Sequence, residues 1–149
     1  MQRECRNIYE NARRTAGMTQ ERWAEALGIS DSAVRQYEAG DITPSDEVVR
    51  RMIEVSMLQP LGYWHLCRKS ELAADMLPSV ERLPLAQAVV QLLARIRDFD
   101  RQHHDDALLE IAADGKIDDT EMPQYKQIVR DLQGIIQAAL QIDFAEKEG

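Results

Sequence analysis

Carboxylates recur at short intervals between Glu110 and Glu121, and their spacing is close to that of a calcium-binding loop. Five residues match positions five, six, eight, nine and twelve of an EF-hand: Asp114, Gly115, Ile117, Asp118 and Glu121. Position one is Glu110 instead of aspartate, however, and position three is Ala112, which has no oxygen ligand. Calcium binding stays the alternative, but we expect no metal. We interpret the run as a glycine-closed helix end followed by a helix that Asp118 caps.

A second group with metal-binding residue types is His103-His104-Asp105-Asp106. One helical face holds two of its ligands at most, for example His104 with Asp100, whereas a zinc site needs three or four. His103 also continues an apolar helical pattern. We therefore expect a partly buried histidine inside a helix bundle and no metal.

Enzyme signatures are missing from the sequence. It has no glycine-rich phosphate loop, no nucleophile-elbow pattern and no paired-histidine zinc helix. Cys5 and Cys67 are far apart and lack the spacing of a metal or redox motif, so we expect both to be reduced and semi-buried in helices. We predict a protein that is not an enzyme and uses no cofactor.

Two short helices joined by a tight turn are predicted between Thr19 and Gly40. Thr19 and Ser30 are suitable N-caps, and Gly28 and Gly40 supply the left-handed conformation that ends a helix. The inward sides are Trp23, Ala24 and Leu27 on the first helix and Val34 and Tyr37 on the second. This is the helix-turn-helix arrangement, whose second helix enters the major groove of DNA.

The segment from about Ile8 to about Val55 resembles the phage-repressor helix-turn-helix family, also called the Cro/repressor or xenobiotic-response-element family. The resemblance is carried by Thr19-Gln20, Ala24, Leu27-Gly28-Ile29-Ser30, Val34, Tyr37-Glu38, Gly40 and Pro44-Ser45. It implies five helices around a small core, with the third helix reading DNA. Trp23 departs from the family pattern, because leucine or phenylalanine is usual there, but we still expect it in the core.

The resemblance also implies which side chains would touch DNA. Base contacts would come from the outward side of the third helix: Asp31, Ser32, Arg35 and Gln36. Phosphate contacts would come from Thr19, Gln20, Thr43 and Arg14.

The net charge of −8 is unusual for a protein that binds DNA, but it is unevenly distributed. Residues 1–69 carry ten basic and ten acidic side chains, whereas residues 70–149 carry eight and sixteen. The acidic excess therefore lies outside the helix-turn-helix, away from phosphates that would repel it. No apolar run is long enough to span a membrane, and no secretory segment is recognisable, so we expect a cytoplasmic protein.

We predict an all-α fold in two domains. Residues 1–76 form a five-helix repressor-like domain, whose fifth helix and its extension run from Pro60 to about Met76. Residues 77–84 are a linker, because two prolines six residues apart interrupt helix. Residues 85–149 form a long antiparallel helical hairpin.

The hairpin follows from two heptad-like seams. The first is Leu85, Val89, Leu92, Ile96, Phe99 and His103, and the second is Tyr125, Ile128, Leu132, Ile135, Ala139 and Ile142. They predict two helices of about 25 to 30 residues joined by a short turn. Five further apolar residues flank the seams: Val90, Leu93, Val129, Ile136 and Leu140.

A two-helix hairpin cannot cover so wide an apolar stripe. We therefore expect these five residues to form the interface of a homodimer, with packing on the chain's own N-terminal domain as the alternative. The functional hypothesis is a transcriptional regulator that binds double-stranded DNA. The competing hypothesis is a protein-interaction module, such as an antitoxin or adaptor, whose acidic C-terminal bundle binds another protein.

Overall fold

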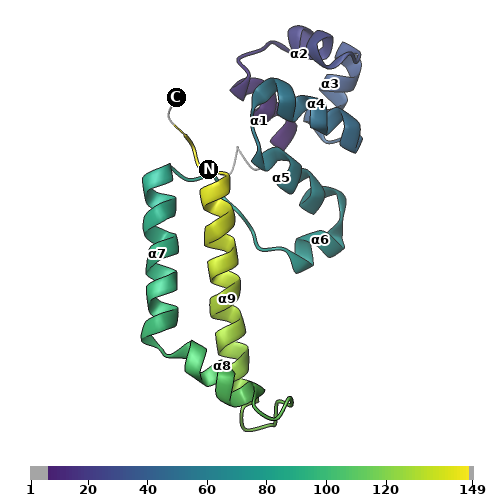
Figure 1. Cartoon of the computed structure of the whole chain (residues 1–149). Coiled ribbons are helices and arrows are strands. Elements are labelled where there is room, and N and C mark those ends of the chain that lie inside the picture. The colour runs from purple at the N-terminus through teal and green to yellow at the C-terminus, as the bar shows by residue number, and fades with distance from the viewer. Residues whose placement is uncertain (1–6, 148–149) are drawn as a thin grey trace. The chain divides into compact units, whose positions relative to one another are not determined.

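The computed structural model describes residues 7–147, and within this range the chain is helical without a strand, apart from a single parallel bridge between Pro84 and Glu146. This confirms the all-α prediction. The structure divides into two compact units, Met1–Leu77 (unit 1) and Pro78–Gly149 (unit 2), which are described separately (Figure 1). None of the helices in the described residues is both long and apolar enough to cross a membrane.

In its described residues, unit 1 has six helices, and the first five surround one apolar core. They are α1 (Ile8–Thr15), α2 (Gln20–Leu27), α3 (Asp31–Ala39), α4 (Asp46–Ser56), α5 (Pro60–Lys69) and α6 (Glu71–Met76). The core collects buried side chains from α1 to α5 and the loop before α5: Tyr9, Ala12, Trp23, Ala24, Leu27, Val34, Val48, Val49, Met52, Leu58 and Leu61. Trp23 is 1% exposed, so it fills the core position expected of it.

The ends of α2 and α3 follow the predicted capping. The hydroxyl of Thr19 accepts from the backbone N–H of Arg22, and that of Ser30 accepts from Ala33. Gly28 and Gly40 adopt the left-handed conformation, with φ of 68° and 84°. Because each end carries its own local signal, these 22 residues are enough to fix where both helices begin and end.

The predicted fifth helix is interrupted. Ser70 separates α5 from α6, and its hydroxyl accepts from the N–H of Ala73 at the start of α6. A serine in extended conformation favours such a cap over continuation of the helix. The predicted extension of the fifth helix is therefore a separate short helix that begins after Ser70.

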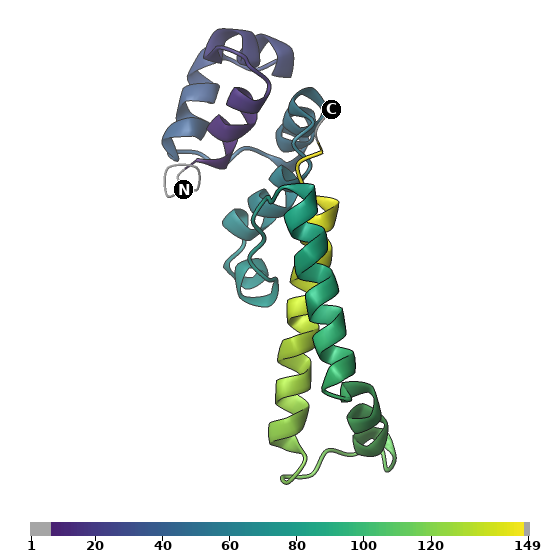
Figure 2. The ribbon, with the colours of Figure 1, turned by 90° about the vertical axis from the view of Figure 1, so that its left-hand side faces the viewer.

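Unit 2 is built on two long helices that run antiparallel, as Figures 1 and 2 both show. Its helices are α7 (Leu85–Arg101), α8 (His104–Ala112) and α9 (Met122–Asp143). The start of α7 lies beside the end of α9, where Glu146 donates its N–H to the carbonyl of Leu83 at 2.9 Å. Further along, Arg95 lies over Gly134, where an added Cβ would come within 2.5 Å of its guanidinium.

The first arm of the hairpin is broken into α7 and α8, in contrast to the predicted single helix. The chain takes a left-handed conformation at His103, with φ of 55°. This turn places His104 inside, where its Nε2 lies 2.6 Å from Asp131 Oδ2 on α9 and its ring meets Phe99 edge to face at 5.2 Å. His103, predicted to be partly buried, is 79% exposed. The left-handed turn at His103 therefore buries His104 and leaves His103 in solvent.

The face of α7 that contacts α9 matches the predicted seam only in part. Ala88 is fully buried and the seam residues Leu92 and Phe99 are half-buried, whereas the seam residues Leu85, Val89 and Ile96 are 43%, 36% and 45% exposed. The contact uses Ala88 and Arg95, because a small side chain and the glycine opposite Arg95 permit close approach of the helices. A stripe of apolar side chains on α7 is consequently left in solvent.

The segment predicted as a linker packs on unit 2. Val80 is 5% exposed, Arg82 Nε donates to the carbonyl of Phe144 at 3.3 Å, and Gln137 donates to the carbonyl of Ser79. These contacts attach residues 79–84 to the end of α9.

Candidate nucleic-acid interface

The four predicted base-contacting residues share one exposed side of α3. Asp31, Ser32, Arg35 and Gln36 are all exposed, whereas Val34 is buried at 1%. At about 100° per residue, positions one, four and five after Asp31 fall within about 140° of the helix circumference, so the four side chains share one broad side. The structure therefore brings together a carboxylate, a hydroxyl, a guanidinium and an amide, which are the groups that read the edges of base pairs.

Glu38, on the inward side of α3, connects this helix to α1 and α2. Its carboxylate receives two hydrogen bonds from Arg13, with N–O distances of 2.6 and 3.2 Å, and one from the amide of Gln20 at 2.9 Å. Both members of the ion pair are largely buried, with side chains 14% and 8% exposed. The hydrogen bond to Glu38 raises the pKa of Arg13, so its guanidinium stays protonated.

Asn7 adds two hydrogen bonds to the end of α3. Its amide donates to the carbonyls of Tyr37, at 2.8 Å, and Glu38. Its Oδ1 also caps α1 by accepting from Tyr9 and Glu10. One side chain therefore ties the first turn of α1 to the last turn of α3.

The turn between α2 and α3 is held from α4. Arg51 donates from Nη1 to the carbonyl of Leu27 at 2.6 Å, and its Nη2 lies 3.0 Å from Glu47. Leu27 is the last residue of α2, so the guanidinium satisfies a carbonyl that the helix itself leaves without a partner.

The predicted phosphate-contacting residues have different local roles. The hydroxyl of Thr19 caps α2, and the amide of Gln20 is engaged by Glu38. Thr43 is exposed in the loop before α4. Arg14 is 72% exposed and lies 2.7 Å from Glu10, so its charge is accessible although it is paired.

A chain of polar contacts, buried at Tyr9 and His65 and exposed at Asp46, joins α1, α4 and α5. His65, 4% exposed, lies between Tyr9 and Asp46, with Nδ1 2.8 Å from the phenol and Nε2 3.0 Å from the carboxylate. Burial raises the pKa of Tyr9. Hydrogen bonds from Lys69 and then from His65 lower the pKa of Asp46.

Sequence analysis did not predict the contacts that Glu38, Arg13, Asn7, Arg51 and His65 make. The partners in these contacts lie 18 to 56 residues apart, except for the local pair Arg51–Glu47 and the Asn7 cap of α1. Their side chains are polar, so the apolar pattern contains no signal for them. Only the tertiary structure reveals that Asn7 and Arg13 hold α3 in place, that Arg51 holds the turn before it, and that His65 joins α1 to α4.

The loop that resembles an EF-hand is organised by its own hydrogen bonds. Asp118 Oδ1 accepts from the N–H groups of Thr120 and Glu121, and Glu121 Oε2 accepts from the N–H of Asp118. The hydrogen bond from the Thr120 hydroxyl makes the largest contribution to lowering the pKa of Asp118. The N–H groups of Glu121 and Thr120 contribute smaller amounts. Asp118 thus caps the turn of residues 118–121. The prediction that it caps the next helix was wrong, because α9 begins at Met122 with Glu121 at the N-cap position. Within residues 7–147, no three His, Cys, Asp or Glu side chains come together as a metal site.

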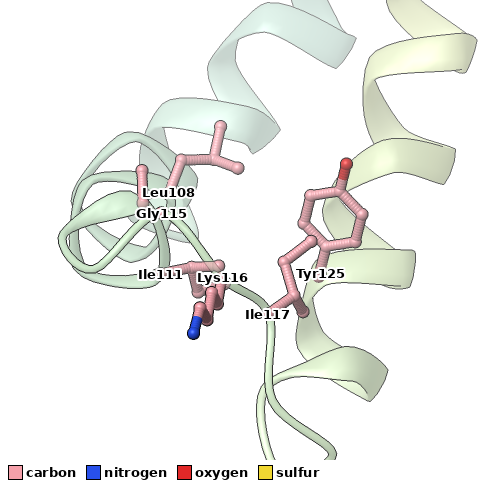
Figure 3. A pocket seen from close by; sticks show the side chains of 7 residues that line it. Leu108, Ile111, Gly115, Lys116, Ile117 and Tyr125 are labelled. Atoms are coloured by element: carbon pink, nitrogen blue, oxygen red, sulfur yellow. The ribbon is translucent and has the colours of Figure 1, made fainter.

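Beside this loop is a small apolar hollow of about 230 Å³ between α8 and α9 (Figure 3). Leu108 and Ile111 approach it from α8, Ile117 from the loop and Tyr125 from α9. The inward position of Ile117 shows how the loop folds back on the end of the hairpin.

Only one of the two cysteines lies among the described residues. Cys67 is half-buried on α5, and burial raises the pKa of its thiol. Cys5 lies outside the described residues.

Comparison with known proteins identifies the helix-turn-helix. Residues 10–60 match a family model described as a helix-turn-helix domain, which covers α1 from Glu10 through α4 to the first residue of α5. No curated protein and no solved structure matched the chain. The chain therefore carries a helix-turn-helix domain with α2 and α3 as its two central helices.

Proposed function

We propose that this chain is a sequence-specific transcriptional regulator of the phage-repressor type, which binds double-stranded DNA by placing α3 in the major groove. It acts by binding and not by catalysis. The observation that carries the proposal is the exposed polar side of α3 within a segment that matches a helix-turn-helix domain. Helices in this position read base edges in many regulators.

The chemistry of the four side chains supports base recognition. The amide of Gln36 matches the N6 and N7 groups of adenine, and the guanidinium of Arg35 matches O6 and N7 of guanine. Asp31 accepts from the amino group of cytosine, and Ser32 fits several bases. Contacts by Thr19, Gln20, Thr43 and Arg14 to the phosphates would set the register of α3 on the duplex.

We infer that two copies bind two half-sites. Recognition helices of such dimers are about 34 Å apart, which is one turn of DNA. The surplus apolar side chains on unit 2 support a pairing of hairpins. Among the predicted interface residues, Val90, Leu93 and Ile136 are exposed and Val129 and Leu140 are half-buried.

A gel-shift assay with DNA from upstream of the protein's own gene tests this function. Duplex selected from a random pool by the purified chain serves as a second probe. We expect a shifted band that specific duplex, but not random duplex, competes away. Absence of binding to either probe would contradict the proposal and favour the antitoxin or adaptor hypothesis.

Gln36→Ala is expected to weaken binding to the selected site by about 1–3 kcal/mol and to relax the preference at one base pair. The reason is that a bidentate amide contact distinguishes adenine from the other bases. Affinities for a set of single-base variants of the site measure both effects. Gln124→Ala, at an exposed glutamine of α9, is the control and leaves binding unchanged. Equal weakening on random duplex would show that Gln36 contacts only the DNA backbone.

Arg14→Ala is expected to weaken binding to all duplexes alike and to reduce the slope of log K against log salt by about one unit. This follows if the exposed guanidinium neutralises one phosphate. Fluorescence anisotropy at several salt concentrations measures the slope. An unchanged slope would remove Arg14 from the interface.

A further inference from the structure

Unit 2 exposes an apolar stripe that runs along both long helices. On α7 it consists of Val89, Leu93 and Ile96, and on α9 of Val129, Leu132 and Ile136. Val89, Leu93, Ile96 and Ile136 are 36%, 43%, 45% and 53% exposed, and the other two are half-buried. Isolated apolar side chains are common on protein surfaces, but a contiguous stripe of this kind marks an interaction site.

The two halves of the stripe lie on the same face of the hairpin. Val89 and Ile96 each follow a residue that contacts α9, namely Ala88 and Arg95. On α9, Val129 follows Ile128, which is fully buried. One step along a right-handed helix turns by about 100° in the same sense. Because the helices are antiparallel, that step moves both rows of side chains to one side.

Charge is absent from one end of this face. Residues 85–94 on α7 and 132–142 on α9 contain no Asp, Glu, Lys or Arg, although 30% of the chain is charged. These two segments lie beside each other, because the start of α7 is next to the end of α9 (Figure 2). The opposite end is strongly acidic, since residues 98–121 hold nine acidic and two basic side chains.

We propose that a second copy of this chain covers the uncharged end, and that the two hairpins overlap there with their acidic ends pointing in opposite directions. This geometry rests on the homodimer proposed above and specifies its interface. An uncharged apolar face is complementary to itself, as a two-fold contact requires. Nucleic acid or a charged partner protein would find no opposite charge on it.

The same charges select one of the two ways of pairing hairpins. A two-fold axis along the hairpins would place both acidic ends together, where like charges repel at short range. An axis perpendicular to them separates the acidic ends. The chain also joins unit 2 at the uncharged end, through residues 78–84, so a perpendicular axis there brings the two junctions close together.

The mass of the full chain in solution without DNA tests the interface, independently of whether it binds DNA. We expect twice the 17.0 kDa of one chain at tens of micromolar. Leu93→Glu should give the mass of one chain, because it places a charge in the stripe. Leu109→Glu makes the same change at a side chain that is 72% exposed near the acidic end, and it should stay dimeric. A monomeric wild type, or a dimeric Leu93→Glu, would overturn the proposal.

If Leu93→Glu fails to fold, as judged by circular dichroism, variants of opposite charge at Val89 test the same interface. Val89 is central in the uncharged segment, so two-fold symmetry brings the two copies of Val89 near each other. Val89→Glu and Val89→Lys should each be monomeric, and an equimolar mixture should form a heterodimer. A mixture that stays monomeric would overturn the proposal.

Spin labels distinguish the two pairings. With Cys5 and Cys67 replaced by serine, a label at Ala113→Cys reports the distance between the acidic ends. Overlap through the uncharged ends puts the labels roughly 50 Å apart, from a rise of about 1.5 Å per residue along α9. A distance below about 25 Å would show the acidic ends together and contradict the perpendicular axis.

Discussion

A chain cut after Leu77 is expected to bind a single half-site as tightly as the full chain does, but a palindrome at least about 100-fold more weakly. Unit 1 contains its own buried core, with Trp23, Leu27 and Met52 each 1% exposed, so the fragment should fold. Without unit 2 it loses the link to a second copy, which supplies the second half-site at high effective concentration. Anisotropy titrations on half-site and palindromic duplexes of equal length measure the two affinities.

The full chain carrying Leu93→Glu is the matched control for the cut. It keeps the acidic charge of unit 2 but should lose the dimer, so it separates the effect of dimerisation from that of repulsion. The fragment should bind random duplex slightly more tightly than this variant, because the charge of −8 in residues 70–149 is nearly absent from it. A fragment that is dimeric, or that binds the palindrome like the full chain, would assign dimerisation to unit 1.

The second large effect is expected from Arg13→Ala, which should lower the free energy of unfolding of unit 1 by about 3 kcal/mol. The substitution leaves Glu38, 8% exposed, with only the amide of Gln20 as a charge-stabilising side-chain partner. A buried carboxylate without its counter-ion is costly. Both tryptophans, Trp23 and Trp64, lie in unit 1, so their fluorescence during urea unfolding follows this unit alone.

The neighbouring residue provides the control for that measurement. Arg14→Ala breaks an ion pair with Glu10 in which the arginine is 72% exposed, and exposed pairs contribute little. We expect a change below about 0.5 kcal/mol. Removing Arg13 and Glu38 together should cost less than the sum of the two single changes. Equal losses in Arg13→Ala and Arg14→Ala would show that burial of the Arg13–Glu38 pair has no special weight.

Sequence alone predicted the parts of the fold whose signals are local. Thr19, Gly28, Ser30 and Gly40 each act through their own backbone or that of the next few residues, and the structure confirms all four. The exposed side of α3 was predictable for the same reason, since Val34 faces inward.

Features that depend on distant residues were not predictable. The break at His103 accompanies the contact of His104 with Asp131, 27 residues away. No glycine or proline nearby predicts the break from sequence. On α7 two apolar patterns overlap, and periodicity alone could not select the one through Ala88. The choice depends on what α9 presents, including Gly134 opposite Arg95.

The attachment of α3 has a consequence for how its specificity can change during evolution. Every anchor described for this helix is on its inward side or at its end: Val34 in the core, Glu38 against Arg13 and Gln20, and the carbonyls held by Asn7. The outward residues Asp31, Ser32, Arg35 and Gln36 are exposed, and surface substitutions usually change stability by less than about 0.5 kcal/mol. Relatives of this chain can therefore acquire different recognition residues on an unchanged scaffold, without a second substitution to restore the fold.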